Sequence, residues 1–205
     1  FTYCNLKCIF CQNYEISTKN IGKEISIEKL SDICLNLQNQ GANNINLVTP
    51  THYIPLIKEA LIKAKNKGLT IPIIYNTSGY EKVSSLKLLE GLIDIYIPDL
   101  KYKSEILGKK YSNAPDYFNI TTKAIKEMYR QVGKPKFSKE GIMQKGLIVR
   151  HLAIPENEKD SKEILSYLYN TYKNNIYISL MNQYTPIRKT KYNELNRKLS
   201  KKEYY

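Results

Sequence analysis

Three cysteines lie close together near the start of the chain, in the stretch CNLKCIFC. A structural zinc site needs four ligands, commonly supplied as two short pairs, and no second pair follows Cys4, Cys8 and Cys11. An iron–sulfur cubane takes four thiolates, so three would leave one iron open to a ligand from outside the protein. We therefore interpret the three cysteines as cluster ligands whose fourth partner is a substrate or cofactor. Zinc held by the cysteines and one converging histidine is the alternative.

Composition and charge narrow the class of protein. The chain has 205 residues and a net charge of +13, but only four of its 32 basic residues are Arg and the lysines are scattered. We expect no nucleic-acid partner, because a basic patch is normally gathered on one face. No apolar run approaches the roughly 18 residues of a membrane span, so we expect no membrane insertion. Clustered, unpaired cysteines indicate a reducing compartment, which predicts a cytoplasmic protein.

Strand-like and helix-like stretches alternate along the whole chain. Apolar runs of strand length occupy 44–48, 70–75, 92–97, 146–152 and 176–181, and amphipathic stretches occupy 26–41, 55–68, 86–90, 116–132 and 161–172. This alternation predicts an α/β fold with parallel strands covered by helices. With residues 1–3 as the end of a truncated first strand, we predict a partial (β/α)6 barrel. Residues 133–145 are expected to form a loop or a small hairpin, and Cys34 to be a small buried side chain.

Residues 1–205 are expected to form a single domain. The chain begins almost inside the cysteine motif and ends in a helix-like stretch, NELNRKLSKKEYY. We therefore expect it to be a fragment that lacks extensions at both ends.

Polar residues follow every predicted strand. They lie in the stretches TPTHY (49–53), NTSGY (76–80) and PDLKY (98–102), at Arg150 and His151, and in NQY (182–184). In parallel α/β folds, ligands bind where the carboxyl ends of the strands gather, so we predict a site at this edge. Taken singly, each group has a simpler interpretation. Asp99 and Lys101 share a strand face and would form an ion pair, and residues 76–79 have the composition of a turn.

The cysteine loop resembles the CxxxCxxC loop of the radical S-adenosylmethionine (SAM) enzymes, with an aromatic residue before the third cysteine. Other stretches resemble the branch related to pyruvate formate-lyase activating enzyme: CQNYEIS, NINLVTPTHY, PIIYNTSGY, IDIYIPDLKY, EMYRQVG and GLIVRHL. The resemblance implies a [4Fe–4S] cluster whose open iron chelates the amino and carboxylate groups of SAM. It further implies reductive cleavage of SAM to a 5′-deoxyadenosyl radical, which abstracts hydrogen from a substrate.

The resemblance also assigns roles to single residues. Cys4, Cys8 and Cys11 match the cluster ligands, and Phe10 matches an aromatic residue near the adenine. Asp99 and Lys101 match an acidic and basic pair near the methionine moiety, and Arg150 matches an arginine that contacts the cofactor. The remaining candidates for cofactor binding are Thr49, Thr51, Asn76 and Ser78.

Two motifs of the family are altered in this chain. The glycine-rich "GGE" stretch is replaced by TPTHY, so Thr49 and Thr51 are candidates for the amino group of SAM by position alone. A "DTN" segment helps to hold a monovalent cation in glycyl-radical activases. Here it reads Asn76, Thr77, Ser78, and one carboxylate is missing. Neither His52 nor His151 receives a role.

Three functions fit these observations. The first is radical activation of a glycyl-radical enzyme, with electrons from a donor such as flavodoxin or ferredoxin. The second is radical chemistry on a small molecule or a peptide. The third, of another class, is a metal-binding or electron-transfer module without catalysis. Such a module has no need of Asp99, Lys101 and Arg150 at the strand ends, which favours the enzymes.

Overall fold

A six-stranded sheet forms the centre of the molecule in the computed structural model, which describes residues 1–19 and 21–204. Its strands follow one another in space as β1-β2-β3-β5, and both β4 and β6 pair with β5. All pairings are parallel except that of β4 with β5. The strands are β1 (Ile45–Val48), β2 (Ile73–Thr77), β3 (Ile95–Pro98), β4 (Lys136–Phe137), β5 (Met143–Leu152) and β6 (Tyr177–Met181).

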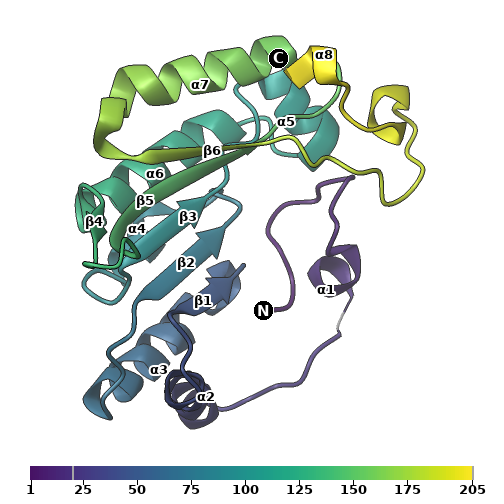
Figure 1. The fold of residues 1–205 in the computed structure, drawn as a ribbon. Helices are drawn as coiled ribbons and strands as arrows, with labels where there is room; N and C mark the ends of the chain where they lie inside the picture. The colour runs from purple at the N-terminus through teal and green to yellow at the C-terminus, as the bar shows by residue number, and fades with distance from the viewer. Residues whose placement is uncertain (20, 205) are drawn as a thin grey trace.

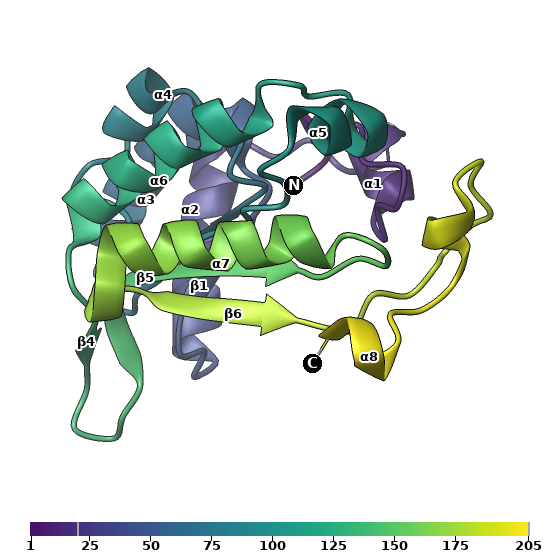
Figure 2. The same ribbon diagram turned by 90° about the horizontal axis from the view of Figure 1, so that it is seen from above.

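Helices cover the outer face of this curved sheet, and the amino-terminal segment lies at the ends of the strand arrows (Figure 1). Seen from above, α6 and α7 run alongside the strands, while α1 and α5 lie toward the arrowheads (Figure 2). The helices are α1 (Tyr14–Thr18), α2 (Ile27–Asn39), α3 (Ile54–Asn66), α4 (Val83–Lys87), α5 (Glu105–Ser112), α6 (Tyr117–Val132), α7 (Glu158–Tyr172) and α8 (Lys201–Tyr204), with 3-10 turns η1 (Thr51–Tyr53), η2 (Lys173–Asn175) and η3 (Asn193–Asn196). None of these helices has the length and apolar character needed to cross a membrane.

Local sequence explains why helix α2 begins where it does. The side chain of Ser26 accepts a hydrogen bond from the backbone N–H of Lys29, as an N-cap residue does. Cys34 is 1% exposed and packs in the core, which confirms the prediction that it is a small buried side chain. Helical periodicity places Ile27, Leu30, Ile33, Cys34 and Leu37 on one predicted apolar face, but Ile33 and Leu37 of this face are exposed.

The core lies between the sheet and its helices. Apolar side chains of the strands meet those of α3, α6 and α7, and several buried tyrosines contribute large rings to the same cluster. Examples that are fully buried are Ile57, Leu61, Ile73, Tyr75, Tyr96, Leu147, Val149 and Ile164. Because both faces of β2 are buried, its sequence is almost continuously apolar before Asn76, as expected for a covered parallel strand.

The predicted α/β fold with parallel strands is confirmed, and the segment 133–145 contains the predicted hairpin between β4 and β5. The barrel is not closed. Residues 1–3 form no strand. Tyr3 has a positive φ of 63°, and the segment contacts β1 through the α-amino group of Phe1, which donates to O of Val48, the last residue of β1. The helix expected at the carboxyl end is instead η3 followed by the short α8.

Candidate active site

The cysteine loop lies at the carboxyl ends of the strands, between α5 and the loop that follows β2 (Figure 1). Its backbone is tied to the end of α5, because Lys7 N donates to Ser112 O and Ile9 N donates to Tyr111 O. On the other side, the amide of Asn5 donates to Tyr80 O at 2.5 Å. The position of the loop is therefore set by two elements that are distant from it in sequence.

All three predicted cluster ligands are free thiols. Cys8 Sγ accepts a hydrogen bond from Ser112 Oγ at 3.0 Å, and Cys4 Sγ accepts one from Leu6 N at 3.5 Å. Burial raises the pKa of the Cys4 and Cys8 thiols. Among residues 1–19 and 21–204, no group of three or more Cys, His, Asp or Glu side chains forms a preassembled metal site.

The two histidines do not complete a zinc site with these thiols. His151 is buried, with Nδ1 2.7 Å from Leu100 O and Nε2 2.9 Å from Ser161 Oγ, so both ring nitrogens have partners. Its burial lowers its pKa, which favours the neutral ring. His52 is exposed in η1. The structure thus offers no support for the zinc alternative.

Asp99 lies at the centre of a group of opposite charges. Its carboxylate is 2.5 Å from Lys101 Nζ and 2.7 Å from Arg150 Nη2, and Arg150 Nε also donates to it at 2.9 Å. Arg150 reaches further and donates to Asn76 Oδ1 at 2.8 Å. The register explains the arrangement, because Asp99 and Arg150 are bridge partners at the end of the β3–β5 ladder. The ion pair expected between Asp99 and Lys101 is formed. We call Asp99, Lys101, Arg150 and Asn76 the Asp99 group.

Asp99 and Lys101 keep each other ionised although both side chains are largely buried. Burial disfavours the charged carboxylate of Asp99, but the charges of Lys101 and Arg150 outweigh this effect and lower its pKa. Burial also disfavours the charged ammonium of Lys101, yet the charge of Asp99 raises its pKa above the ordinary value. The side chains of Asp99, Lys101 and Arg150 are 15%, 18% and 28% exposed. Each therefore keeps some access to a ligand.

The other predicted site residues surround this group on neighbouring strand ends. Ser78 Oγ lies 3.4 Å from Asn5 Oδ1 of the cysteine loop. Thr49 N donates to Asn76 O at 2.8 Å, and Thr51 Oγ1 donates to a glutamate, Glu81, at 2.6 Å. Phe10, on the cysteine loop itself, packs edge-to-face against Tyr184, with ring centroids 6.0 Å apart.

Two residues of this region had no part in the sequence-based prediction. Glu81 is buried and accepts hydrogen bonds from Thr51, which follows β1, and from Thr77, the last residue of β2. The Tyr117 hydroxyl lies 2.7 Å from Ser78 O and 2.8 Å from Asp99 O, and it accepts from Lys101 N at 3.1 Å. A sequence signal existed for Glu81, an acidic residue four positions after the end of a buried strand. None existed for Tyr117, which comes from α6.

Comparison with known proteins decides the family. The model of the Radical SAM superfamily matches residues 1–168. The chain belongs to the Radical SAM superfamily. An uncharacterized protein of Methanocaldococcus jannaschii, MJ0674, is 28% identical over 99% of this chain, which spans 58% of that protein. The chain thus spans little more than half of this relative.

Several solved structures share the fold at low sequence identity. SuiB of Streptococcus suis bound to SAM superposes with a TM-score of 0.64 at 18% identity, covering 92% of this chain and 41% of SuiB. SuiB bound to its precursor peptide SuiA gives a TM-score of 0.64 at 17% identity, covering 92% and 40%. HydG, a maturase of the [FeFe]-hydrogenase, gives 0.62 at 13% identity, covering 98% and 45%.

Membership of the radical SAM superfamily implies a [4Fe–4S] cluster and SAM. The residues present fit both groups by their chemistry. Three thiols on one loop provide the thiolate ligands, and donors already reach Cys4 and Cys8. Charged side chains at the strand ends match a zwitterionic cofactor, with cations at Lys101 and Arg150 and carboxylates at Asp99 and Glu81.

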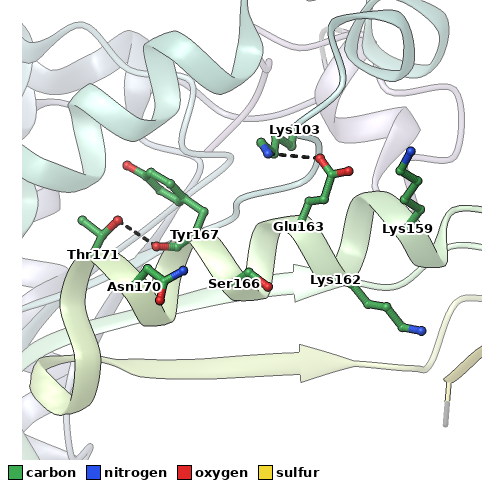
Figure 3. A pocket seen from close by; sticks show the side chains of 8 residues that line it. All are labelled: Lys103, Lys159, Lys162, Glu163, Ser166, Tyr167, Asn170 and Thr171. Atoms are coloured by element: carbon green, nitrogen blue, oxygen red, sulfur yellow. Dashed lines mark hydrogen bonds and ion pairs between the residues drawn. The ribbon is translucent and has the colours of Figure 1, made fainter.

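A groove of about 640 Å³ lies elsewhere, along α7 (Figure 3). It is lined by Lys103, Lys159, Lys162, Glu163, Ser166, Tyr167, Asn170 and Thr171. Lys103 forms an ion pair with Glu163 across it. None of the predicted site residues lines this groove, and its side chains are those of a solvated helix surface. We therefore place the chemistry at the strand ends.

Replacing Gly79 by Ala is expected to distort the end of β2. Gly79 has φ +79°, and a Cβ there would lie 2.3 Å from Asp99 O and 2.7 Å from Thr121 Cγ2. Backbone strain alone costs about 1–2 kcal/mol, and the clash adds to it. We expect Gly79→Ala to lower the free energy of unfolding by about 2 kcal/mol or more, measured in denaturant. Gly91→Ala is the control, since Gly91 has φ +77° but no atom within 4 Å of its Cβ position. Equal losses in both variants would show that the close packing against Asp99 is unimportant.

Proposed function

We propose that this chain is the catalytic core of an enzyme that reductively cleaves SAM and uses the 5′-deoxyadenosyl radical to abstract hydrogen from a peptide or protein. The observation that carries the proposal is the docking of the cysteine loop beside the charged strand ends, through Asn5 on Tyr80 O and Ser78. This docking brings the candidate cluster ligands and the candidate SAM ligands to one edge of the sheet. A reduced cluster held by Cys4, Cys8 and Cys11 would supply the electron for cleavage of the sulfonium.

The protein's own side chains then have distinct tasks. Lys101 and Arg150 bind the carboxylate of SAM, while Asp99 holds both cations in place. Phe10 is proposed to contact the adenine, and Thr49, Thr51, Asn76 and Ser78 to contact the polar groups of the cofactor. A monovalent cation at this segment would have to displace an existing contact, because Asn76 Oδ1 already accepts from Arg150.

A peptide or protein substrate is favoured because SuiB, of similar fold, is solved with a precursor peptide. Within this class we propose the glycyl residue of a glycyl-radical enzyme, in line with the sequence blocks CQNYEIS, NTSGY and PDLKY. An electron donor such as flavodoxin or ferredoxin is the proposed second partner.

Anaerobic incubation of the reconstituted protein with SAM and dithionite is expected to release 5′-deoxyadenosine and methionine, even without substrate. The reason is that cleavage needs only the cluster, one electron and bound SAM. The measurement is chromatography of both products in equal amounts. A reconstituted cluster without any SAM cleavage would contradict the proposal and favour the electron-transfer module.

The substrate is tested separately. Addition of a glycyl-radical enzyme from the same organism, labelled with deuterated glycine, is expected to transfer deuterium into 5′-deoxyadenosine and to give a glycyl radical signal in electron paramagnetic resonance. Cleavage of SAM without deuterium transfer would leave the radical chemistry in place and exclude this substrate.

A further inference from the structure

Glu81 is a buried carboxyl group with unequal oxygens. The residue is 2% exposed. Its Oε1 accepts from Thr77 Oγ1 at 2.5 Å, Thr51 Oγ1 at 2.6 Å and the Tyr75 hydroxyl at 3.2 Å. Its Oε2 is buried without a hydrogen-bond partner among the described residues. Buried carboxyl groups normally have partners for both oxygens or a counter-charge nearby. Glu81 departs from this pattern at Oε2.

Thr51 connects this buried group to the strand ends. Its hydroxyl has a single hydrogen, which it donates to Glu81, so its remaining lone pairs can only accept. Thr51 is half-buried at the start of η1, and only Thr49 and Pro50 separate it from the end of β1. The preceding turn is strained, because Thr49 is β-branched and has φ 54°. Such strain persists where the surroundings hold it, commonly at functional sites.

Among the charges at these strand ends, the Asp99 group offers no free carboxylate for the ammonium group of SAM. SAM carries a carboxylate, an ammonium and a sulfonium. Lys101 and Arg150 match the carboxylate, but Asp99 is already paired with both of these cations. In the described loops that follow β1 and β2, the one carboxylate is Glu81. It has no cationic partner in any ion pair of the described residues.

We propose that Glu81 is a positioning residue that acts through Thr51 on the ammonium group of SAM. Glu81 fixes the Thr51 hydroxyl as an acceptor and places a negative charge directly behind it. The ammonium donates to Thr51 Oγ1 and is attracted by the carboxylate at the far end of the same hydrogen-bonded chain. This inference rests on the proposed function, because it assumes that SAM binds at these strand ends.

The test compares two ligands on the reconstituted protein by calorimetry under anaerobic conditions. The ligands are SAM and an S-adenosyl analogue that lacks the α-amino group. Glu81→Gln keeps the size of the side chain and removes its charge, and it is expected to weaken SAM binding about ten- to thirtyfold. Binding of the analogue should change less than about twofold, because it has no ammonium to lose.

Variants of the partners complete the design. Thr51→Val removes the acceptor and should reproduce the selective loss, whereas Thr51→Ser keeps the hydroxyl and should bind SAM normally. Tyr75→Phe removes the longest hydrogen bond to Glu81 and should leave SAM affinity unchanged. Thermal melting of Glu81→Gln should stay equal or rise, because burial disfavours the charged carboxylate and raises its pKa.

The outcomes separate this inference from the proposed function. If the unaltered protein binds SAM and Glu81→Gln binds it equally well, the role of Glu81 is wrong and the proposed function stands. If Glu81→Gln weakens both ligands equally, Glu81 is merely structural and the inference is again overturned. If the unaltered protein binds neither ligand, the proposed function and the inference fall together.

Discussion

Replacing Cys4, Cys8 or Cys11 by Ala is expected to abolish the iron–sulfur cluster, whereas Cys34→Ala should leave iron content unchanged. With three protein thiolates for four irons, loss of one leaves two irons without a protein ligand. Cys34 cannot compensate, because it is 1% exposed on the buried face of α2. Anaerobic reconstitution followed by iron and sulfide analysis and visible absorbance provides the measurement, with one [4Fe–4S] cluster per chain expected for the unaltered protein.

Cys34→Ala is a matched control because it makes the same change, Cys to Ala, at a cysteine outside the candidate cluster site. Deleting its buried sulfur should cost about 1 kcal/mol through the cavity it leaves, so its melting temperature falls slightly while iron binding persists. A protein that instead binds one tight zinc ion per chain, with no iron–sulfur absorbance, would contradict the cluster assignment.

Hydrophobic periodicity was sufficient to predict the elements that build the sheet. The runs at 44–48 and 146–152 both form strands, β1 and β5, although in β1 only Ile45 and Leu47 are buried while Asn46 and Val48 are exposed. The strand predicted for residues 1–3 does not form. This segment makes a single backbone hydrogen bond to β1, from the amino group of Phe1. One such bond does not offset the entropy of ordering the segment.

The sequence predicts which residues lie at the strand ends but not which of their side chains pair with one another. Asp99, Lys101 and Arg150 were expected at the strand ends because polar residues follow apolar runs. Their mutual pairing depends on the register of β3 against β5, which no local sequence pattern determines. The hydrogen bonds of Glu81 are unpredictable for the same reason, since Thr51 and Thr77 reach it from the ends of different strands, although its place after a buried strand was visible in the sequence.

We expect the Asp99 group to have two roles, SAM binding by Lys101 and Arg150 and stabilisation of the fold by Asp99, and different variants separate them. Arg150→Ala and Lys101→Ala each remove one cation but leave Asp99 paired with the other. We expect them to weaken SAM binding about ten- to a hundredfold, as for the loss of one charge-assisted hydrogen bond of about 1.5–3 kcal/mol. Fold and cluster content should survive. Cofactor binding, iron content and thermal melting are measured on the same preparations. Unchanged binding with reduced melting would mean that these cations serve only in structural ion pairs.

Asp99→Asn should have the larger effect on stability, because it leaves Lys101 and Arg150 side by side without their shared anion. Removing one partner of a buried pair costs about 3 kcal/mol or more, which lowers the melting temperature by roughly 6–12 °C for a chain of this size.

The sign of the pH dependence of stability follows from the lowered pKa of Asp99. Its stabilisation is complete above the ordinary pKa of Asp, about 3.9, and is lost as the pH falls through the lower folded value. The stability difference between the unaltered protein and Asp99→Asn should therefore be constant near neutral pH and shrink in acid. A difference independent of pH down to unfolding would show that the Asp99 charge does not hold the two cations.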